Sequence, residues 1–212
     1  MSKVITIAQQ KGGSGKTTIA ANLATVFSLK NNLKTTILDT DPQGSLGKWF
    51  MMRLEKLKDK NTIDFKTASL WGAQYEAKTL KEKSDIIIID TPPKIDADGR
   101  PAIQIADLVI IPISPSQVDF WATESIIDLA KREKKEILIV INRANAKSKL
   151  IREAIKFVKD MNVSSAKTIL GSRQVFVASM GVGLTAVEKQ RTGKGCLEII
   201  SLAQEVRAIL KI

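Results

Sequence analysis

The sequence predicts an α/β fold: a doubly wound, mostly parallel sheet with helices on both faces. Short apolar runs rich in β-branched residues alternate with helical patterns along the 212 residues. The runs IIII (86–89) and ILIVI (137–141) contain no polar residue, which is typical of strands covered on both faces. Repeated strand–helix units favour parallel pairing through right-handed crossovers. The length favours one domain over residues 1–212.

The first half of the chain contains three strand–helix pairs. The β-branched run VITIA (4–8) is the first strand, and the loop after it leads into a helix from Thr17 to about Lys30. The run TTILD (35–39) is the second strand, and the pattern after it predicts a helix around 47–58. The third pair is expected over 63–68 and 73–83.

Continuous apolar runs mark the strands of the second half. They are DIIIID (85–90), LVIIPI (108–113) and ILIVIN (137–142). Helical patterns near 118–133 and 148–160 follow the last two of these runs. A final strand and helix are expected over 167–170 and within 193–211.

Polar clusters stand at the ends of four predicted strands. Residues 11–18 follow the first strand, 39–43 the second, 90–93 the fourth and 142–143 the sixth. The carboxyl ends of parallel strands meet at one edge of a doubly wound sheet, and this edge is where such sheets bind ligands. The sequence therefore predicts one ligand site built from all four clusters.

The stretch QQKGGSGKTT (9–18) predicts a phosphate-binding loop, because its glycines let backbone N–H groups face an anion at a helix N-terminus. Lys16 is placed to reach the β- and γ-phosphates of a nucleotide, and the Thr17 hydroxyl to ligate Mg²⁺. The residues expected to bind the nucleotide here are Gly12, Gly13, Ser14, Gly15, Lys16, Thr17 and Thr18. A second lysine, Lys11, has no evident local task beside Lys16.

Three carboxylates stand at strand ends near this loop. Asp90 ends the buried run IIIID, a position that suits Mg²⁺ held directly or through water. Asp39 and Asp41 are two residues apart in DTDPQGS, so both project to one side at the end of a strand. One of them is expected to orient the attacking water. Asp39 is also a candidate Mg²⁺ ligand and, alternatively, a cap for the following helix.

Together KGGSGKTT, DTDPQGS and IIIIDTPP resemble the ParA/MinD family of deviant-Walker P-loop ATPases, most closely the short ParA partition ATPases. The resemblance continues through SPSQVDFWAT (114–123) and NR (142–143) and covers nearly the whole chain. It implies that Lys11 crosses a dimer interface to the nucleotide of the other subunit, where it acts like an arginine finger. It also implies that Asp41 positions the hydrolytic water.

The same resemblance implies that Asn142 reads adenine and that Arg143 lies over the base. The amide of Asn142 can both donate to a purine and accept from it. The dipeptide NR also fits a helix-capping turn, so this alternative stays open.

The activity implied by the resemblance is slow, Mg²⁺-dependent ATP hydrolysis. It would be carried out by a homodimer that forms on ATP, binds DNA non-specifically, and is stimulated by a small ParB-like, centromere-binding or adaptor protein. The cargo would be a plasmid, a chromosome or a protein assembly. The chain has no histidine, the commonest general base, which agrees with slow turnover. With a single cysteine, Cys196, and no signal-peptide core, it is expected to be cytoplasmic and nucleoid-associated.

The positive charge is concentrated in the C-terminal part of the chain. The net charge is +11; residues 1–130 hold 16 Lys/Arg and 15 Asp/Glu, whereas residues 131–212 hold 17 and 7. This imbalance favours a polyanionic partner such as DNA, although a lysine-rich solvated surface is the alternative. The predicted DNA contacts are Lys167, Arg173, Lys189, Arg191 and Lys194, with Arg173 and Arg191 as the leading choices.

Other branches of the family fit this sequence less well. The chain starts at the first strand, so the helix-turn-helix extension of longer ParA proteins is not expected. Residues 201–212 lack the interfacial aromatics and dense basic face of a membrane anchor, so we expect a docked helix there. The nitrogenase iron-protein branch needs two cysteines per subunit, and a tyrosine-kinase branch needs more tyrosines than Tyr75. A MinD-like membrane-surface ATPase or a metabolic ATPase of the same fold remains the alternative.

Overall fold

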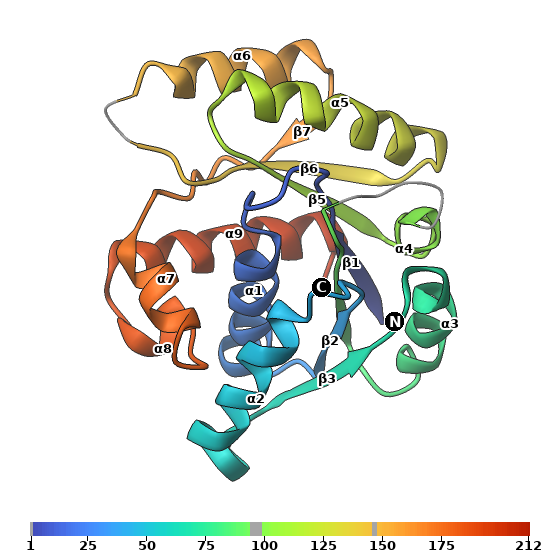
Figure 1. Ribbon diagram of the computed structural model, residues 1–212, viewed down its shortest axis with the longest axis vertical. Helices are drawn as coiled ribbons and strands as arrows, with labels where there is room; N and C mark the ends of the chain where they lie inside the picture. The colour runs from blue at the N-terminus through green and yellow to red at the C-terminus, as the bar shows by residue number, and fades with distance from the viewer. Residues whose placement is uncertain (1, 94–98, 146–147) are drawn as a thin grey trace.

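The computed structural model describes residues 2–93, 99–145 and 148–212. Its centre is a seven-stranded sheet with the order β3-β2-β4-β1-β5-β6-β7, in which every neighbouring pair is parallel (Figure 1). The strands are β1 (Lys3–Ile7), β2 (Thr35–Asp39), β3 (Ile63–Thr67), β4 (Ile86–Asp90), β5 (Leu108–Ile113), β6 (Glu136–Ile141) and β7 (Ser164–Ser165). The predicted parallel, doubly wound sheet is therefore confirmed.

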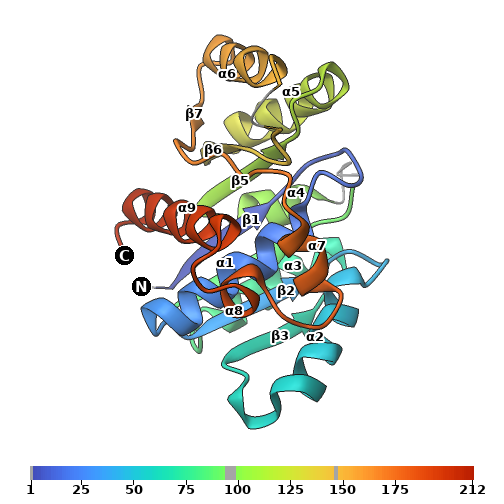
Figure 2. The same cartoon turned by 90° about the vertical axis from the view of Figure 1, so that its left-hand side faces the viewer.

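Helices cover both faces of this sheet (Figures 1 and 2). They are α1 (Lys16–Asn31), α2 (Ser45–Leu57), α3 (Ala73–Leu80), α4 (Arg100–Gln104), α5 (Gln117–Arg132), α6 (Leu150–Asp160), α7 (Gln174–Met180), α8 (Ala186–Lys189) and α9 (Lys194–Leu210), with one-turn 3₁₀ helices at Lys58–Lys60 and Leu70–Gly72. In both views α5 and α6 lie at one end of the molecule and α2 at the other. None of the helices in the described ranges combines the length and hydropathy needed to cross a membrane.

The side chains of the central strands alternate between the two faces of the sheet. One apolar cluster covers the first face, and two separate clusters cover the second face. In β1, Ile5 and Ile7 pack in the layer formed with α1, α2 and α9, whereas Val4 faces the layer of α3 and α4. In β5, Leu108 and Ile110 face the first layer, and Val109 and Ile111 pack in a third cluster with α5 and α6. Burial on both faces explains why these strands read as unbroken apolar runs.

The predicted strand at 167–170 is wrong: the last strand is the two-residue β7. The backbone N–H groups of Lys167 and Thr168 donate to the Glu205 carboxylate of α9, at 2.7 and 2.8 Å. Consecutive N–H groups bound to one side chain cannot continue a ladder with β6. The chain meets β6 again at Leu170, whose N–H donates to the Ile141 main-chain oxygen at 2.9 Å, and Gly171 forms an isolated bridge with Ala144. The helices α4, α7 and α8 were also not predicted, because they are only four to seven residues long.

The other predicted elements lie within a few residues of their expected bounds.

The sheet order explains why the polar clusters meet. The chain leaves β1 for β2 on one side and returns through β4 before it crosses to β5 on the other side. This reversal creates a topological switch point beside β1, where ligands bind in open α/β sheets.

Candidate nucleotide-binding site

The loop between β1 and α1 has the backbone of a phosphate cradle. Gly13 and Gly15 have φ values of 74° and 96°, in the left-handed region that favours glycine. A Cβ atom on Gly15 would also lie 2.3 Å from Nδ2 of Asn142. Gly15 is the N-cap of α1, so the first N–H groups of that 16-residue helix open toward this loop.

Lys16 is the first residue of α1 and is buried. Its Nζ donates to the main-chain oxygen of Gln9 at 3.0 Å, which holds the ammonium group against the loop. Burial lowers the pKa of Lys16, and the nearby carboxylates of Asp90 and Asp41 oppose this shift. The loop also buries the Ser14 hydroxyl, whose oxygen has no hydrogen-bond partner in the described part of the chain.

Thr17, at the start of α1, and Asp90, at the end of β4, form a pair. The Thr17 hydroxyl donates to Oδ2 of Asp90 at 2.7 Å. The other carboxylate oxygen, Oδ1, is buried and has no partner among the described residues. Burial raises the pKa of Asp90 to about 7, against the lowering effect of the Thr17 hydrogen bond. A hydroxyl beside a buried carboxylate with a free oxygen fits Mg²⁺, whose charge favours the ionised carboxylate.

Asp39 lies opposite Asp90 in the register of β2 and β4. Its Oδ1 accepts from the N–H of Asp41 at 3.0 Å, and its Oδ2 from the N–H of Gly47 at 3.2 Å. Burial raises the pKa of Asp39, while these two backbone hydrogen bonds lower it. Both oxygens therefore hold the loop that starts α2, which matches the capping alternative. A role of Asp39 as a Mg²⁺ ligand stays a prediction.

Asp41 is more accessible than Asp39. It is half-buried, and its Oδ1 accepts from the N–H of Gln43 at 2.9 Å. It lines a hollow of about 710 Å³ together with Asp39, Pro42 and the exposed Trp71. A carboxylate at the wall of an open hollow can meet a water molecule, which supports the predicted role of Asp41.

Lys11 has a local partner that the sequence reasoning missed. Its Nζ lies 2.5 Å from Oδ2 of Asp119 in α5; Asp119 is fully buried and the Lys11 side chain is 38% exposed. The Ser116 hydroxyl donates to the same oxygen, and Oδ1 of Asp119 has no partner among the residues described. The expectation that Lys11 lacks a task within its own chain is therefore wrong. The pair joins residues 108 positions apart, so no local pattern signals it.

Asn142 follows β6 and fastens the phosphate loop. Its Nδ2 donates to the Ser14 main-chain oxygen at 2.7 Å, and its Oδ1 accepts from the N–H of Arg143 at 2.9 Å. Arg143 has a φ of 53°, and its Nη1 lies 3.8 Å from where a Cβ on Gly13 would stand. Adenine reading by Asn142 stays a prediction, because both ends of its amide are engaged here.

A hollow of about 280 Å³ lies beside this junction. Besides Gly15, Thr18, Asn142 and Arg143, it is lined by residues of the segment before α7 and of α7 itself. Phe176 and Val177 contribute its apolar surface. The sequence reasoning missed these two residues, because a seven-residue helix gives little periodic signal.

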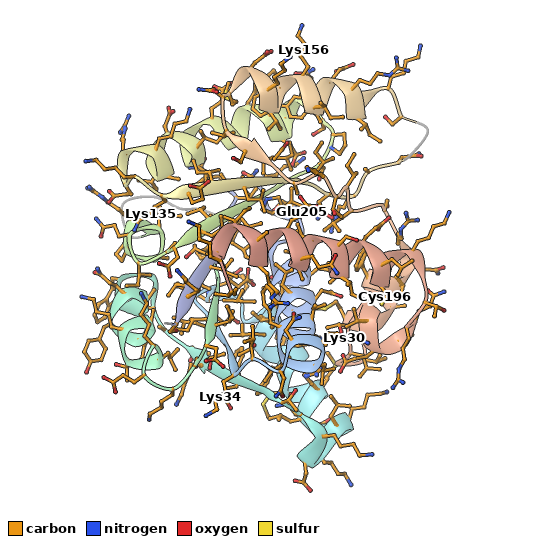
Figure 3. The ribbon with its side chains drawn as sticks, turned by 180° about the vertical axis from the view of Figure 1, so that it is seen from behind. Lys30, Lys34, Lys135, Lys156, Cys196 and Glu205 are labelled. Carbon is orange, nitrogen blue, oxygen red and sulfur yellow. The ribbon has the colours of Figure 1, made fainter. Side chains whose placement is uncertain are left out.

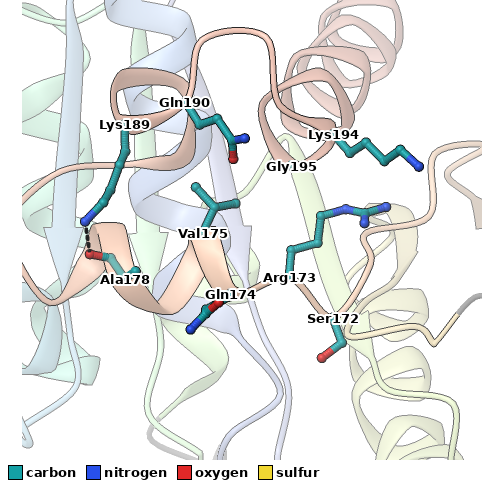
Figure 4. Close-up of a pocket in the computed structure, with 9 residues that line it drawn as sticks. All are labelled: Ser172, Arg173, Gln174, Val175, Ala178, Lys189, Gln190, Lys194 and Gly195. Atoms are coloured by element: carbon teal, nitrogen blue, oxygen red, sulfur yellow. Dashed lines mark hydrogen bonds between the residues drawn. The ribbon is translucent and has the colours of Figure 1, made fainter.

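The five predicted DNA contacts do not form one cluster. Arg173, Lys189 and Lys194 line a single open hollow of about 680 Å³ (Figure 4). Arg191 lines a different hollow, and the backbone of Lys167 is bound to Glu205.

Two of the three clustered cations are already engaged. The guanidinium of Arg173 donates to both carboxylate oxygens of Glu198, which raises its pKa. The ammonium of Lys189 donates to the main-chain oxygen of Ala178 at 2.9 Å. In Figure 4 the side chains of Arg173 and Lys194 extend in the same direction, away from Lys189. Lys194 is therefore the cation of this hollow best placed for an external anion.

The glycine loop at the switch point, with Lys16 inside it and the Thr17–Asp90 pair beside it, is the arrangement of a P-loop nucleotide-binding protein. Residues 5–209 match the family model for the CobQ/CobB/MinD/ParA nucleotide binding domain. The chain belongs to this family, which confirms the resemblance carried by its motifs.

Similar proteins include two whose names refer to carboxysome distribution and to chromosome partitioning. The maintenance of carboxysome distribution protein A of Halothiobacillus neapolitanus is 24% identical over 212 residues, with 97% of this chain and 94% of that protein covered. The chromosome partitioning protein ParA of Myxococcus xanthus is 24% identical, with 96% and 87% covered. The structure of the septum site-determining protein MinD of Pyrococcus horikoshii OT3, complexed with Mg-ADP, matches with a TM-score of 0.80 at 23% identity and covers 99% and 98% of the two chains.

Proposed function

We propose that this protein is a ParA-type ATPase that dimerises on ATP, binds DNA non-specifically and positions a cargo through partner-stimulated hydrolysis. The observation that carries the nucleotide part is the Thr17–Asp90 pair beside Lys16, with one carboxylate oxygen left without a partner. Mg²⁺ is usually held by one or two protein ligands together with nucleotide phosphates and water, and the Thr17 hydroxyl and the Asp90 carboxylate could supply these protein ligands.

In the proposed reaction, water attacks the γ-phosphorus of ATP, the bond to the β–γ bridging oxygen breaks, and the water proton passes to phosphate. Bound Mg²⁺ would supply charge neutralisation between the phosphates. Lys16 places an ammonium at the phosphate loop, and Asp41 holds the attacking water in line. The two positioning relatives and the basic C-terminal part support the assignment to cargo positioning.

Asp41→Ala is expected to keep ATP bound and to lower its hydrolysis about 100-fold, because the water is no longer oriented. Single-turnover hydrolysis and ATP titration with Mg²⁺ measure the two effects separately. Asp59→Ala, which removes an exposed carboxylate from the 3₁₀ helix Lys58–Lys60, is the matched control and should leave both unchanged. If the Asp41→Ala variant hydrolysed ATP at the wild-type rate, Asp39 would become the candidate for orienting the water.

The DNA part of the proposal predicts retention that depends on both ATP and salt. Joining two basic surfaces in a dimer raises avidity, and phosphate contacts weaken steeply as salt rises. Lys189→Glu with Lys194→Glu should remove duplex DNA retention at low salt while ATP-dependent assembly survives. Arg173→Glu is less informative than the sequence suggested, because it would set a carboxylate against Glu198.

Lys156→Glu with Lys159→Glu on α6 is the matched control, since it makes the same charge change at the end of the molecule where Figure 3 labels Lys156. If the two double variants lost DNA retention equally, DNA binding would depend on the net charge of the protein and not on the position of the cations. Negligible DNA retention by the wild type with both ADP and ATP would contradict the DNA part. It would favour the MinD-like membrane-surface or metabolic alternative.

A further inference from the structure

A hollow of about 520 Å³ lies between the C-terminal ends of α1 and α2 and the helix α8. Helix α1 begins in the phosphate loop and runs 16 residues, which is about 24 Å at the α-helical rise. The hollow is therefore at the far end of α1 from the nucleotide site. Its volume is in the range of ligand-binding clefts.

Four cations surround this hollow: Lys30, Lys56, Lys60 and Arg191. All four are exposed, and none has an ion-pair partner within the described ranges. Lys30 and Lys56 lie in the last turns of α1 and α2, where a cation also complements the helix dipole. Lys60 and Arg191 belong to no α-helix, so the dipole does not explain them.

Among the described residues that line the hollow, Glu188 has the only carboxylate, and it does not offset these charges because it is already paired with Arg53. Arg53 donates to its two oxygens at 2.9 and 2.8 Å, and Arg53 is fully buried. The hydroxyl and the N–H of Thr185 also donate to Glu188. The hollow therefore presents a strongly positive rim to solvent.

Apolar side chains also line the hollow, and we refer to them as its floor. Leu29 and Leu57, from the last turns of α1 and α2, line it together with Leu184 and the buried Val187. Leu29 is 45% exposed, so part of this apolar lining is open to solvent. The four cations therefore line the same hollow as these apolar side chains.

The walls of the hollow are held in place by buried polar contacts. The Arg53–Glu188 pair ties α2 to α8, and the Arg53 guanidinium lies over the Trp49 ring at 5.4 Å. Oδ1 of Asn22 in α1 accepts from the N–H of Ala186 in α8 at 3.0 Å. A hollow that is preformed in this way loses little freedom when it binds a ligand.

We propose that this hollow is a docking site for an acidic, leucine-bearing peptide segment of a partner protein. Its apolar side chains fill the floor, and its carboxylates pair with the rim. The phosphates of duplex DNA match the charge of the rim, but they offer no apolar groups to cover the leucines. A membrane-binding surface typically carries interfacial aromatic side chains, and the described residues that line the hollow include none. The inference goes beyond the proposed function, since it needs neither nucleotide nor DNA.

The test is fluorescence anisotropy of the full chain with a short labelled peptide in which leucines recur at helical spacing among glutamates. Lys56→Glu with Lys60→Glu should weaken binding about tenfold, because two rim contacts become repulsive. Leu29→Ser should weaken it several-fold. The α6 control, Lys156→Glu with Lys159→Glu, should bind as the wild type does. Protection from hydrogen exchange at the ends of α1 and α2 would place the peptide in the hollow.

Two further probes separate the sources of binding. A peptide with serine in place of leucine should bind much more weakly; equal binding would overturn the proposal, because charge alone would then suffice. Unchanged affinity in the Lys56→Glu, Lys60→Glu variant would overturn it as well. If duplex DNA or phosphatidylserine vesicles bind the wild type with the same dependence on Lys56, Lys60 and Leu29, the hollow serves that ligand instead.

Discussion

Lys16→Met is expected to lower the affinity for Mg-ATP at least about 100-fold, or by ~3 kcal/mol, because the phosphates lose charge-assisted hydrogen bonds from the ammonium. Lys16 is well placed for this role, since it is buried at the start of α1 and within reach of the loop backbone. Methionine keeps the unbranched stem and much of the buried volume, so the change is directed at the charge. Titration calorimetry with Mg-ATP measures the loss.

The stability of the nucleotide-free protein serves as the control for this variant. Lys16 donates to Gln9, whose side chain in turn bonds to Thr123 and to the Pro112 main-chain oxygen. If the loop is intact without the ammonium, the thermal unfolding midpoint should stay close to that of the wild type. A folded Lys16→Met protein that binds Mg-ATP as tightly as the wild type would contradict the assignment.

The phosphate loop, Asp39 and Asp90 were predictable because local pattern and strand position determine them together. Each follows an apolar run, and the parallel register brings Asp39 and Asp90 opposite each other. The elements that escaped prediction depend on distant partners. Residues 167 and 168 would extend a strand, but the carboxylate of Glu205, 38 and 37 positions away, accepts the hydrogen bonds of their N–H groups.

The same limit applies to the charged residues of the site. The sequence places Arg173 in a basic region, but nothing near it indicates that Glu198 neutralises it. Asp119 looks like a surface residue of α5, yet it is fully buried beneath Lys11. Charge counts predict a basic half of the chain, whereas tertiary pairing decides which of its cations remain available to a partner.

The Lys11–Asp119 pair leads to the prediction on assembly. In the proposed dimer, Lys11 reaches the nucleotide of the second subunit, so it must leave Asp119 when ATP is bound. Lys11→Ala should bind ATP and remain monomeric, because the cation supplied in trans is gone. Light scattering after size exclusion, with ADP and with ATP, measures the assembly state.

Lys11→Ala alone leaves Asp119 buried without its cation, which destabilises the fold and would also suppress assembly. The double variant Lys11→Ala, Asp119→Asn removes both charges and separates these effects: it should unfold near the wild-type midpoint and still remain monomeric with ATP. Asp119→Asn alone keeps Lys11 and frees it from its local partner, so this variant should dimerise at least as readily as the wild type. The double variant could instead dimerise with ATP at the same protein concentrations as the wild type. That result would show that Lys11 serves only its own chain, as the partner of Asp119.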